Sequence, residues 1–249
     1  MKQDSKAIIK VENLTKFYKG TSVPALNNIS FKIFEKDFFG FLGPNGAGKT
    51  TTISILTGIT TFYSGNAFIL ENNIRTSANE IKTQIGVVPQ DIALYPTLTI
   101  HENLVYFGKL YGLNKKTLKE RISFFINKLD LQNKANCKIN TLSGGMKRRV
   151  NLIAGILHNP KIIFLDEPTV GIDVYSKSVI IELLNELNNN GASIIYTSHQ
   201  MEEAENLCNR ITIINNGIIK VNGTISEILN QNNCKNLEEL FLKQTSEIE

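Results

Sequence analysis

Apolar residues along the chain form two kinds of short pattern. Three runs, Ile85–Val88, Ile162–Leu165 and Ser193–Tyr196, are almost continuously apolar, which is typical of parallel strands covered on both faces. Residues Ile29–Phe34 instead alternate apolar and polar positions, as expected of a strand with one buried face. Helical spacing separates the runs, so the sequence predicts an α/β fold with helices on both faces of a parallel sheet.

Shorter elements are predicted near both ends of the chain. Ile8–Val11 indicates a strand. Ile211–Ile214 and Ile218–Val221 flank the turn Asn215-Asn216-Gly217, and this pattern predicts a β-hairpin. Residues 226–249 are expected to form a small tail of two short helices. The apolar stripe expected on that tail comprises Leu237, Leu240 and Phe241.

The stretch from about residue 99 to residue 158 carries three helical patterns and no convincing strand. We therefore expect a helical lobe, residues 92–159, inserted into the α/β core. The predicted organisation is one domain over residues 1–225, with its core at 1–91 and 160–225, followed by the tail at 226–249.

Composition narrows the possible compartments and partners. No apolar stretch approaches the roughly 18 residues needed to span a bilayer, and the polar N-terminus leads into no signal peptide. Three scattered cysteines are expected to be free thiols, so a cytosolic location is expected. The basic run Lys147-Arg148-Arg149 is expected to be a solvated helix face. Because it lacks aromatic neighbours for base stacking, no nucleic-acid partner is expected.

The segment Gly43-Pro44-Asn45-Gly46-Ala47-Gly48-Lys49-Thr50 carries the clearest chemistry. It follows the apolar run Phe38–Leu42 and precedes the helical spacing of Thr51–Thr57. A strand, a glycine-rich turn and a helix are the context in which G-x-x-x-x-G-K-[ST] binds phosphates. Lys49 can reach the β- and γ-phosphates, while the Thr50 hydroxyl can bind Mg²⁺. The sequence therefore predicts nucleotide binding.

A second site is expected where Ile162–Leu165 ends in Asp166-Glu167-Pro168. Successive strand residues point to opposite faces, so these two carboxylates should point in different directions. One can hold Mg²⁺ through water while the other polarises the attacking water. Together with the phosphate-binding segment, the pair indicates a Walker B site.

Leu142-Ser143-Gly144-Gly145-Met146 precedes a further helical run. Taken alone, Ser143 is expected to be the N-cap of an ordinary helix. Its place between the phosphate loop and the acidic pair, however, resembles the signature motif of the ATP-binding cassette (ABC) family. In that family, the motif of one subunit contacts the γ-phosphate held by the other.

The resemblance covers nearly the whole chain and implies a P-loop NTPase with a RecA-like parallel-sheet core, an N-terminal antiparallel β portion and the inserted helical lobe. It implies that Glu167, His199, Lys49 and Gln90 are catalytic, and that Thr50, Gln90 and Asp166 hold Mg²⁺. Val174 stands where the family often has proline, and Met146 where glutamine is common. The residues implied to contact ATP are Tyr18, Gly43, Pro44, Asn45, Gly46, Ala47, Gly48, Lys49, Thr50, Thr51, Ser143, Gly144, Gly145 and Asp173.

The phrases around Ser143–Arg149 and Ser198–Glu205 are similar to those of ABC-2 type exporter subunits. The resemblance thus implies an ATPase subunit that dimerises with ATP and drives separate transmembrane permease subunits at the cytoplasmic face of the cell membrane. An importer subunit and a soluble ABC ATPase acting on a macromolecule remain as alternatives.

A last expectation concerns the membrane partner. Leu94, Tyr95 and Leu98 follow Gln90 and either pack inside the helical lobe or line a groove for a short helix of the membrane subunit. We favour the groove because Gln90 is implied to sense the γ-phosphate.

Overall fold

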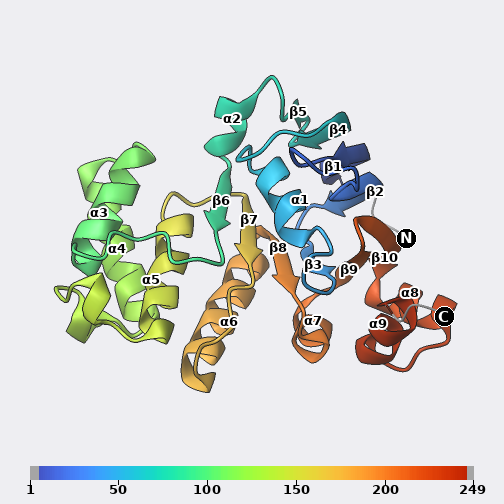
Figure 1. The fold of residues 1–249 in the computed structure, drawn as a ribbon. Helices are drawn as coiled ribbons and strands as arrows, with labels where there is room; N and C mark the ends of the chain where they lie inside the picture. Colours follow the sequence, from blue (N-terminus) through green and yellow to red (C-terminus); the bar gives the residue numbers. More distant parts are fainter. Residues whose placement is uncertain (1–5, 246–249) are drawn as a thin grey trace. The chain divides into compact units, whose positions relative to one another are not determined.

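A computed structural model describes residues 6–245 of the chain. The N-terminal residues in which no signal peptide was expected lie mostly outside this range, as do the last four residues of the predicted tail. The chain divides into a first unit, residues 1–82 and 193–249, and a second unit, residues 83–192 (Figure 1). The predicted limits of the helical lobe, 92–159, remain a prediction.

One sheet of the first unit is antiparallel, with strand order β2-β1-β4-β5. In β2, the side chains of Ile29, Phe31 and Ile33 are buried in alternation, as the sequence predicted. β1 is longer than predicted because it continues through the left-handed residue Asn13, where its register with β2 shifts. The strands are β1 (Ala7–Lys16), β2 (Leu26–Phe34), β4 (Ser64–Ile69) and β5 (Asn72–Asn73).

Four strands of the second sheet belong to the first unit, in the order β10-β9-β3-β8. β3 lies between β8 and β9 and runs parallel to both, and every residue of β3 and β8 is buried. The predicted hairpin is present, because β9 and β10 pair antiparallel across Asn216 and Gly217, both with positive φ. The strands are β3 (Phe38–Leu42), β8 (Ser193–Ser198), β9 (Arg210–Asn215) and β10 (Ile218–Thr224).

The helices of the first unit include the two expected in the tail. Leu237 and Leu240 of α9 are fully buried, whereas Phe241 is half-buried. The Leu237 backbone N–H donates to the Glu205 carboxylate at 2.8 Å, which ties the tail to α7. The helices are α1 (Lys49–Leu56), α2 (Ala78–Lys82), α7 (Met201–Leu207), α8 (Ile225–Asn232) and α9 (Leu237–Thr245).

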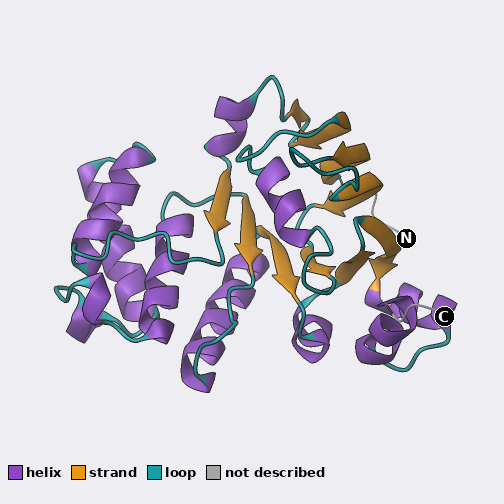
Figure 2. Ribbon diagram, in the orientation of Figure 1, coloured by secondary structure: helices purple, strands orange, loops and turns teal. Residues whose placement is uncertain are grey.

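The second unit contains the parallel strands β6 (Ile85–Val88) and β7 (Ile162–Asp166), and its remaining residues are mostly helical (Figure 2). The three helical patterns predicted between residues 99 and 158 are present as α3, α4 and α5. The helices are α3 (Ile100–Leu110), α4 (Lys115–Lys128), α5 (Gly144–Ile156) and α6 (Val174–Asn189), with short 3₁₀ turns at Gln132–Lys134 and Ile139–Thr141.

Local capping explains where these helices begin. Thr99 and Glu102 form a capping box at α3, and the Asn114 side chain accepts from the Thr117 backbone N–H at α4. The helix α5 packs directly on β6, because a Cβ atom on Gly155 would lie 2.7 Å from the Val87 carbonyl oxygen. This contact places the C-terminal end of α5 directly against β6.

The cysteines Cys137, Cys208 and Cys234 are free, as expected. Burial raises the pKa of the Cys208 thiol well above its usual value, so this thiol is inert at neutral pH. Among the described residues, no helix combines the length and the apolar character that a bilayer crossing requires.

Candidate functional site

The phosphate-binding segment of the first unit has the predicted strand–loop–helix form. It leaves the buried strand β3, and α1 begins at Lys49. Gly46 and Gly48 have φ of 80° and 112°, a left-handed conformation that glycine adopts without strain. A Cβ atom on Gly43 would lie 2.3 Å from the Ile214 carbonyl oxygen, so this position also excludes side chains. The loop is thus compact on its inner side, and Asn45 and Gly46 are exposed.

Lys49 places a positive charge inside this loop. Its side chain is only 6% exposed, and Nζ donates to the carbonyl oxygens of Gly43 at 2.7 Å and Pro44 at 3.0 Å. Thr50 is exposed beside it, with Ala47 and Gly48 buried behind the loop. A curled backbone, a helix N-terminus and a buried ammonium group together suit a phosphate chain.

Tyr18 presents one open ring face. The ammonium group of Lys16 lies 5.1 Å from the centroid of the Tyr18 ring, and Lys16 is 9% exposed whereas Tyr18 is 47% exposed. The Lys16 ammonium also donates to the Thr60 hydroxyl at 3.3 Å, and the Tyr18 hydroxyl hydrogen-bonds Thr51 Oγ1 at 3.1 Å. The buried lysine covers the inner ring face, so the outer face is available for stacking a base. Lys16 could not be predicted from the sequence, because a lysine at the end of a strand carries no motif signal.

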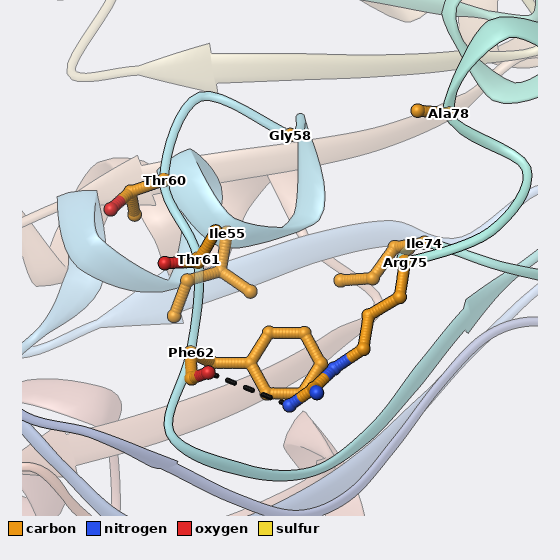
Figure 3. Close-up of a pocket in the computed structure, with 8 residues that line it drawn as sticks. All are labelled: Ile55, Gly58, Thr60, Thr61, Phe62, Ile74, Arg75 and Ala78. Carbon is orange, nitrogen blue, oxygen red and sulfur yellow. Dashed lines mark hydrogen bonds between the residues drawn. The ribbon is translucent and has the colours of Figure 1, made fainter.

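Figure 3 shows a separate pocket of about 240 Å³ in the same unit, beyond the C-terminal end of α1. The Arg75 guanidinium group lies over the Phe62 ring, 4.0 Å from its centroid, and the Thr60 hydroxyl points away from both side chains. None of the residues implied to bind ATP lines this pocket.

His199 lies near the phosphate-binding loop in the first unit. It directly follows Ser198, whose register partner across the parallel pair β3–β8 is Leu42, the residue before Gly43. The carboxyl ends of parallel strands meet at one edge of a sheet, which is where ligands bind in open α/β sheets. His199 is exposed at this edge, whereas His158 of the second unit stacks on Tyr111 with 3.6 Å between ring centroids.

Gln90 and the acidic pair share the corresponding edge of the second unit. β6 and β7 pair in parallel with Val88 opposite Leu165, so the segments that follow both strands start side by side. Gln90 is exposed, while Asp166 and Glu167 are only 5% and 7% exposed. Buried carboxylates beside an exposed amide are suited to a cation that is also bound by a substrate.

The expectation that Asp166 and Glu167 alternate as strand residues was wrong. β7 ends at Asp166, and Glu167 has a φ of 47°. Glu167 therefore lies in a left-handed turn, a conformation that costs free energy for a residue with a side chain and that is often found at functional sites.

The signature segment forms the beginning of α5. Ser143 is the N-cap of this helix and accepts from the Met146 backbone N–H at 3.2 Å, so the capping interpretation of the sequence is correct. Gly144 faces open space. A Cβ atom on Gly145 would instead lie 2.2 Å from Ser176 Oγ and 2.5 Å from Asp173 Oδ2. Of the first two residues of this helix, Gly144 is exposed and Gly145 is buried.

Asp173 joins this segment to α6. It is the N-cap of α6 and accepts from the Ser176 backbone N–H at 2.8 Å, and the hydrogen bonds with Ser176 hold the pKa of the Asp173 carboxyl below its usual value. Val174, where the family often has proline, is 85% exposed. The beginnings of α5 and α6 therefore pack against each other within one unit.

The basic run Lys147–Arg149 is not the solvated face that the sequence analysis expected. Arg148 and Arg149 are only 7% and 4% exposed. Arg149 donates to the Leu129 carbonyl oxygen at 2.7 Å, and Arg148 donates to the Pro89 carbonyl oxygen at 3.0 Å. Each guanidinium group thus donates to a backbone carbonyl oxygen in another segment of the chain. The spacing of residues along the sequence does not reveal such a contact.

The groove expected at Leu94, Tyr95 and Leu98 is not supported for Leu94. Leu94 is 8% exposed and packs in the interior, whereas Tyr95 is 46% exposed and Leu98 is half-buried. The Tyr95 hydroxyl donates to the Tyr106 hydroxyl at 3.0 Å. The two tyrosines are therefore exposed in this region, whereas Leu94 is not.

The described residues contain no group of three or more histidine, cysteine or acidic side chains that could hold a metal ion.

The chain is similar in sequence to a known family and to known proteins. A family model described as ABC transporter matches residues 26–170. The linearmycin resistance ATP-binding protein LnrL of Bacillus subtilis is 45% identical over 221 residues, which cover 89% of this chain and 70% of that protein. The Nod factor export ATP-binding protein I of Cupriavidus pinatubonensis is 37% identical over 85% of this chain and 64% of its own length. Human ATP-binding cassette sub-family A member 2 is 38% identical over 87% of this chain, which spans 9% of that protein.

Solved structures are also similar. The structure of an ATP-binding subunit of an ABC transporter has a TM-score of 0.89 and 26% identity, covering 96% of this chain and 100% of that one. A dimeric ATP-binding cassette in a post-hydrolysis state, bound to ADP and Pi, has a TM-score of 0.79 and 28% identity, covering 87% of this chain and 98% of that one.

Proposed function

Because this chain belongs to the ABC transporter family, we propose that it is the ATP-hydrolysing subunit of an exporter whose membrane subunits are separate chains. The observation that carries the proposal is the phosphate-binding loop with its buried lysine. Lys49 lies within hydrogen-bonding distance of the loop carbonyls at both Gly43 and Pro44, so its charge is already at the site where phosphate charge develops.

The residues of the first unit are proposed to bind the nucleotide. The open face of Tyr18 stacks on adenine, the backbone N–H groups of 43–50 bind the phosphates, and the Thr50 hydroxyl is offered to Mg²⁺. His199 at the end of β8 contacts the γ-phosphate. These assignments follow the family resemblance and fit the exposure of Tyr18, Thr50 and His199.

The residues of the second unit are proposed to act on the cation and on water. Asp166 and Gln90 help to hold Mg²⁺, which would supply charge neutralisation of the phosphates when bound. Glu167 accepts a hydrogen bond from the attacking water and orients it. That these residues serve the same nucleotide as Lys49 is proposed from the family resemblance alone.

Two copies of the chain are proposed to enclose the nucleotides. Ser143, Gly144 and Gly145 of one copy meet the γ-phosphate bound to the other, and the open surroundings of Gly144 leave room for that approach. Asp173 and the exposed Val174 belong to the same dimer surface. The dimeric relative bound to ADP and Pi supports this arrangement.

Export is proposed from the relatives. The linearmycin resistance protein and the Nod factor export protein both align over most of this chain. The chain would then act on the cytoplasmic side of the cell membrane, where its permease subunits receive the closing motion. The exposed pair Tyr95 and Tyr106 is the surface that we assign to those subunits.

The test is to purify the tagged chain from its native membrane in mild detergent, identify the proteins that co-purify and measure MgATP hydrolysis. A stoichiometric multi-span membrane protein whose presence raises ATPase activity is expected. Recovery with nucleic acid or a ribosomal particle would refute the transporter role, and dependence on an extracytoplasmic substrate-binding protein would refute export.

A further inference from the structure

The segment that follows β6 is fastened to the signature helix α5 by two buried side chains. We infer that Arg148 and Asn151 are positioning residues that hold Gln90 and the signature motif together as one body. The inference rests on the proposed roles of Gln90 and of Ser143–Gly145. It adds a role for Arg148 and Asn151, to which the proposed function assigns none.

The contacts form a clamp, which we define as Arg148 and Asn151 with the backbone of Pro89 and Ala93. Arg148 Nη1 donates to the Pro89 carbonyl oxygen at 3.0 Å, and Asn151 Nδ2 donates to the same oxygen at 3.3 Å. The Ala93 backbone N–H donates to Asn151 Oδ1 at 3.1 Å. The backbone on both sides of Gln90 is thus held by one helix, while the Gln90 side chain stays exposed.

The clamp is buried and its geometry is fixed. Arg148 is 7% exposed and Asn151 is 3% exposed. One turn further along α5, a Cβ atom on Gly86 of β6 would lie 2.3 Å from the Gly155 carbonyl oxygen, so strand and helix touch backbone to backbone. The helix therefore cannot shift along β6 without breaking either this contact or the clamp. In Figure 1 the chain leaves β6 and crosses toward α3 through this clamped segment.

The charge of Arg148 also matters. Burial lowers the pKa of its guanidinium group, while the carboxylates of Asp91, Asp166 and Glu167 oppose that shift. A guanidinium group stays protonated at neutral pH, so Arg148 carries its charge among the acidic residues of this edge. Replacing it removes a hydrogen bond to Pro89 and a charge that these carboxylates face.

The consequence is a direct mechanical connection inside one unit. Gln90 follows the clamped carbonyl of Pro89, and α5 begins at the signature residues Ser143–Gly145. A displacement of Gln90 on binding the cation is passed to α5 and so to the helix N-terminus that meets the partner's nucleotide. Without the clamp, Gln90 can move while α5 stays in place.

The experiment is a double-mutant cycle on the purified full chain, with MgATP affinity, kcat and the Mg²⁺ concentration for half-maximal hydrolysis measured for each protein. The proteins are wild type, Arg148→Met, Gln90→Ala and the double variant. Lys147→Met, the neighbouring charge deletion on the same helix, is the matched control, and Arg148→Lys tests rescue by a cation.

Arg148→Met should keep MgATP affinity, require more Mg²⁺ and lower kcat about tenfold to a hundredfold, the range that a misplaced catalytic group can cost. Because the clamp acts through Gln90, the double variant should lose little beyond Gln90→Ala. Arg148→Lys should recover part of kcat, and Lys147→Met should match wild type.

Additive losses in the double variant, or an unchanged Mg²⁺ requirement, would overturn the inference. Should Arg148→Met fail to fold, Asn151→Ala replaces it in the double-mutant cycle. Additive losses or an unchanged Mg²⁺ requirement would then overturn the inference in the same way. A wild-type chain without ATPase activity would instead refute the proposed function, so the two failures are distinguishable.

Discussion

The two adjacent glycines of the signature segment should respond in opposite ways to the same substitution. Gly144 and Gly145 both lie in the first turn of α5, and neither has a positive φ. A methyl group on Gly144 meets no atom within 4 Å, whereas one on Gly145 would lie 2.2 Å from Ser176 Oγ and 2.8 Å from Ser176 Cβ. Ser176 is 1% exposed, so it has no room to withdraw.

The size of the effect can be worked from these contacts. Overpacking a tight interior contact costs about 1–3 kcal/mol of stability. Alanine gains at most about 1 kcal/mol over glycine in a helix. Subtracting a gain of about 1 kcal/mol from this cost, Gly145→Ala should lower the free energy of unfolding by about 0–2 kcal/mol. Gly144→Ala should leave it unchanged or raise it by at most about 1 kcal/mol.

The assay is urea unfolding of both variants followed by far-ultraviolet circular dichroism, with MgATP hydrolysis measured in parallel. Gly145→Ala also pushes against Asp173, so it should impair hydrolysis even at temperatures where the protein stays folded. Equal unfolding midpoints for the two variants would show that the contact with Ser176 does not determine the need for glycine at residue 145.

Three further outcomes are expected. Lys49→Ala should weaken MgATP binding severely in a nucleotide-binding titration, because the loop loses its buried cation; near-normal affinity would contradict the phosphate-binding assignment. Lys16→Met removes the cation beside the Tyr18 ring and its hydrogen bond to Thr60, so ATP binding should weaken about threefold to tenfold, whereas tripolyphosphate, which has no base to stack on Tyr18, should lose less; equal losses for both ligands would contradict the stacking role of Tyr18. Burial lowers the pKa of His158, so its contribution to stability is present above about pH 6.5 and is lost as the pH falls through the lower folded pKa. Unfolding midpoints at pH 7.5 and 5.5 should therefore differ less in His158→Gln than in wild type, and His101→Gln serves as the exposed control; an unaltered pH response in His158→Gln would reject this.

The parts of the fold that follow from local pattern were predictable. Continuous apolar runs marked β6, β7 and β8, and the Asn-Gly turn marked the hairpin of β9 and β10. The sequence analysis missed β4, β5, α2 and α7. β4 begins with Ser64-Gly65-Asn66 and α7 has seven residues, so neither is long or periodic enough to be read without its tertiary neighbours.

Motif spacing led to the roles predicted for Lys49, Asp166 and His199, and these roles stay predictions. The structure adds where the side chains lie: Lys49 and Asp166 are buried, and His199 is exposed. Arg148 was interpreted as exposed because a run of three basic residues is usually solvated, and only tertiary packing shows that it binds the Pro89 carbonyl oxygen. The left-handed conformation of Glu167 likewise depends on how β7 ends, which residue type alone does not determine.

The most direct test of the central claim is sedimentation of Glu167→Gln with MgATP. The amide fits the space of the carboxylate but cannot accept the proton of the attacking water. We expect this variant to form a stable dimer that binds ATP and scarcely hydrolyses it, whereas the wild-type chain hydrolyses ATP. A variant that stays monomeric with MgATP while hydrolysing at the wild-type rate would contradict both the assigned role of Glu167 and the proposed dimer.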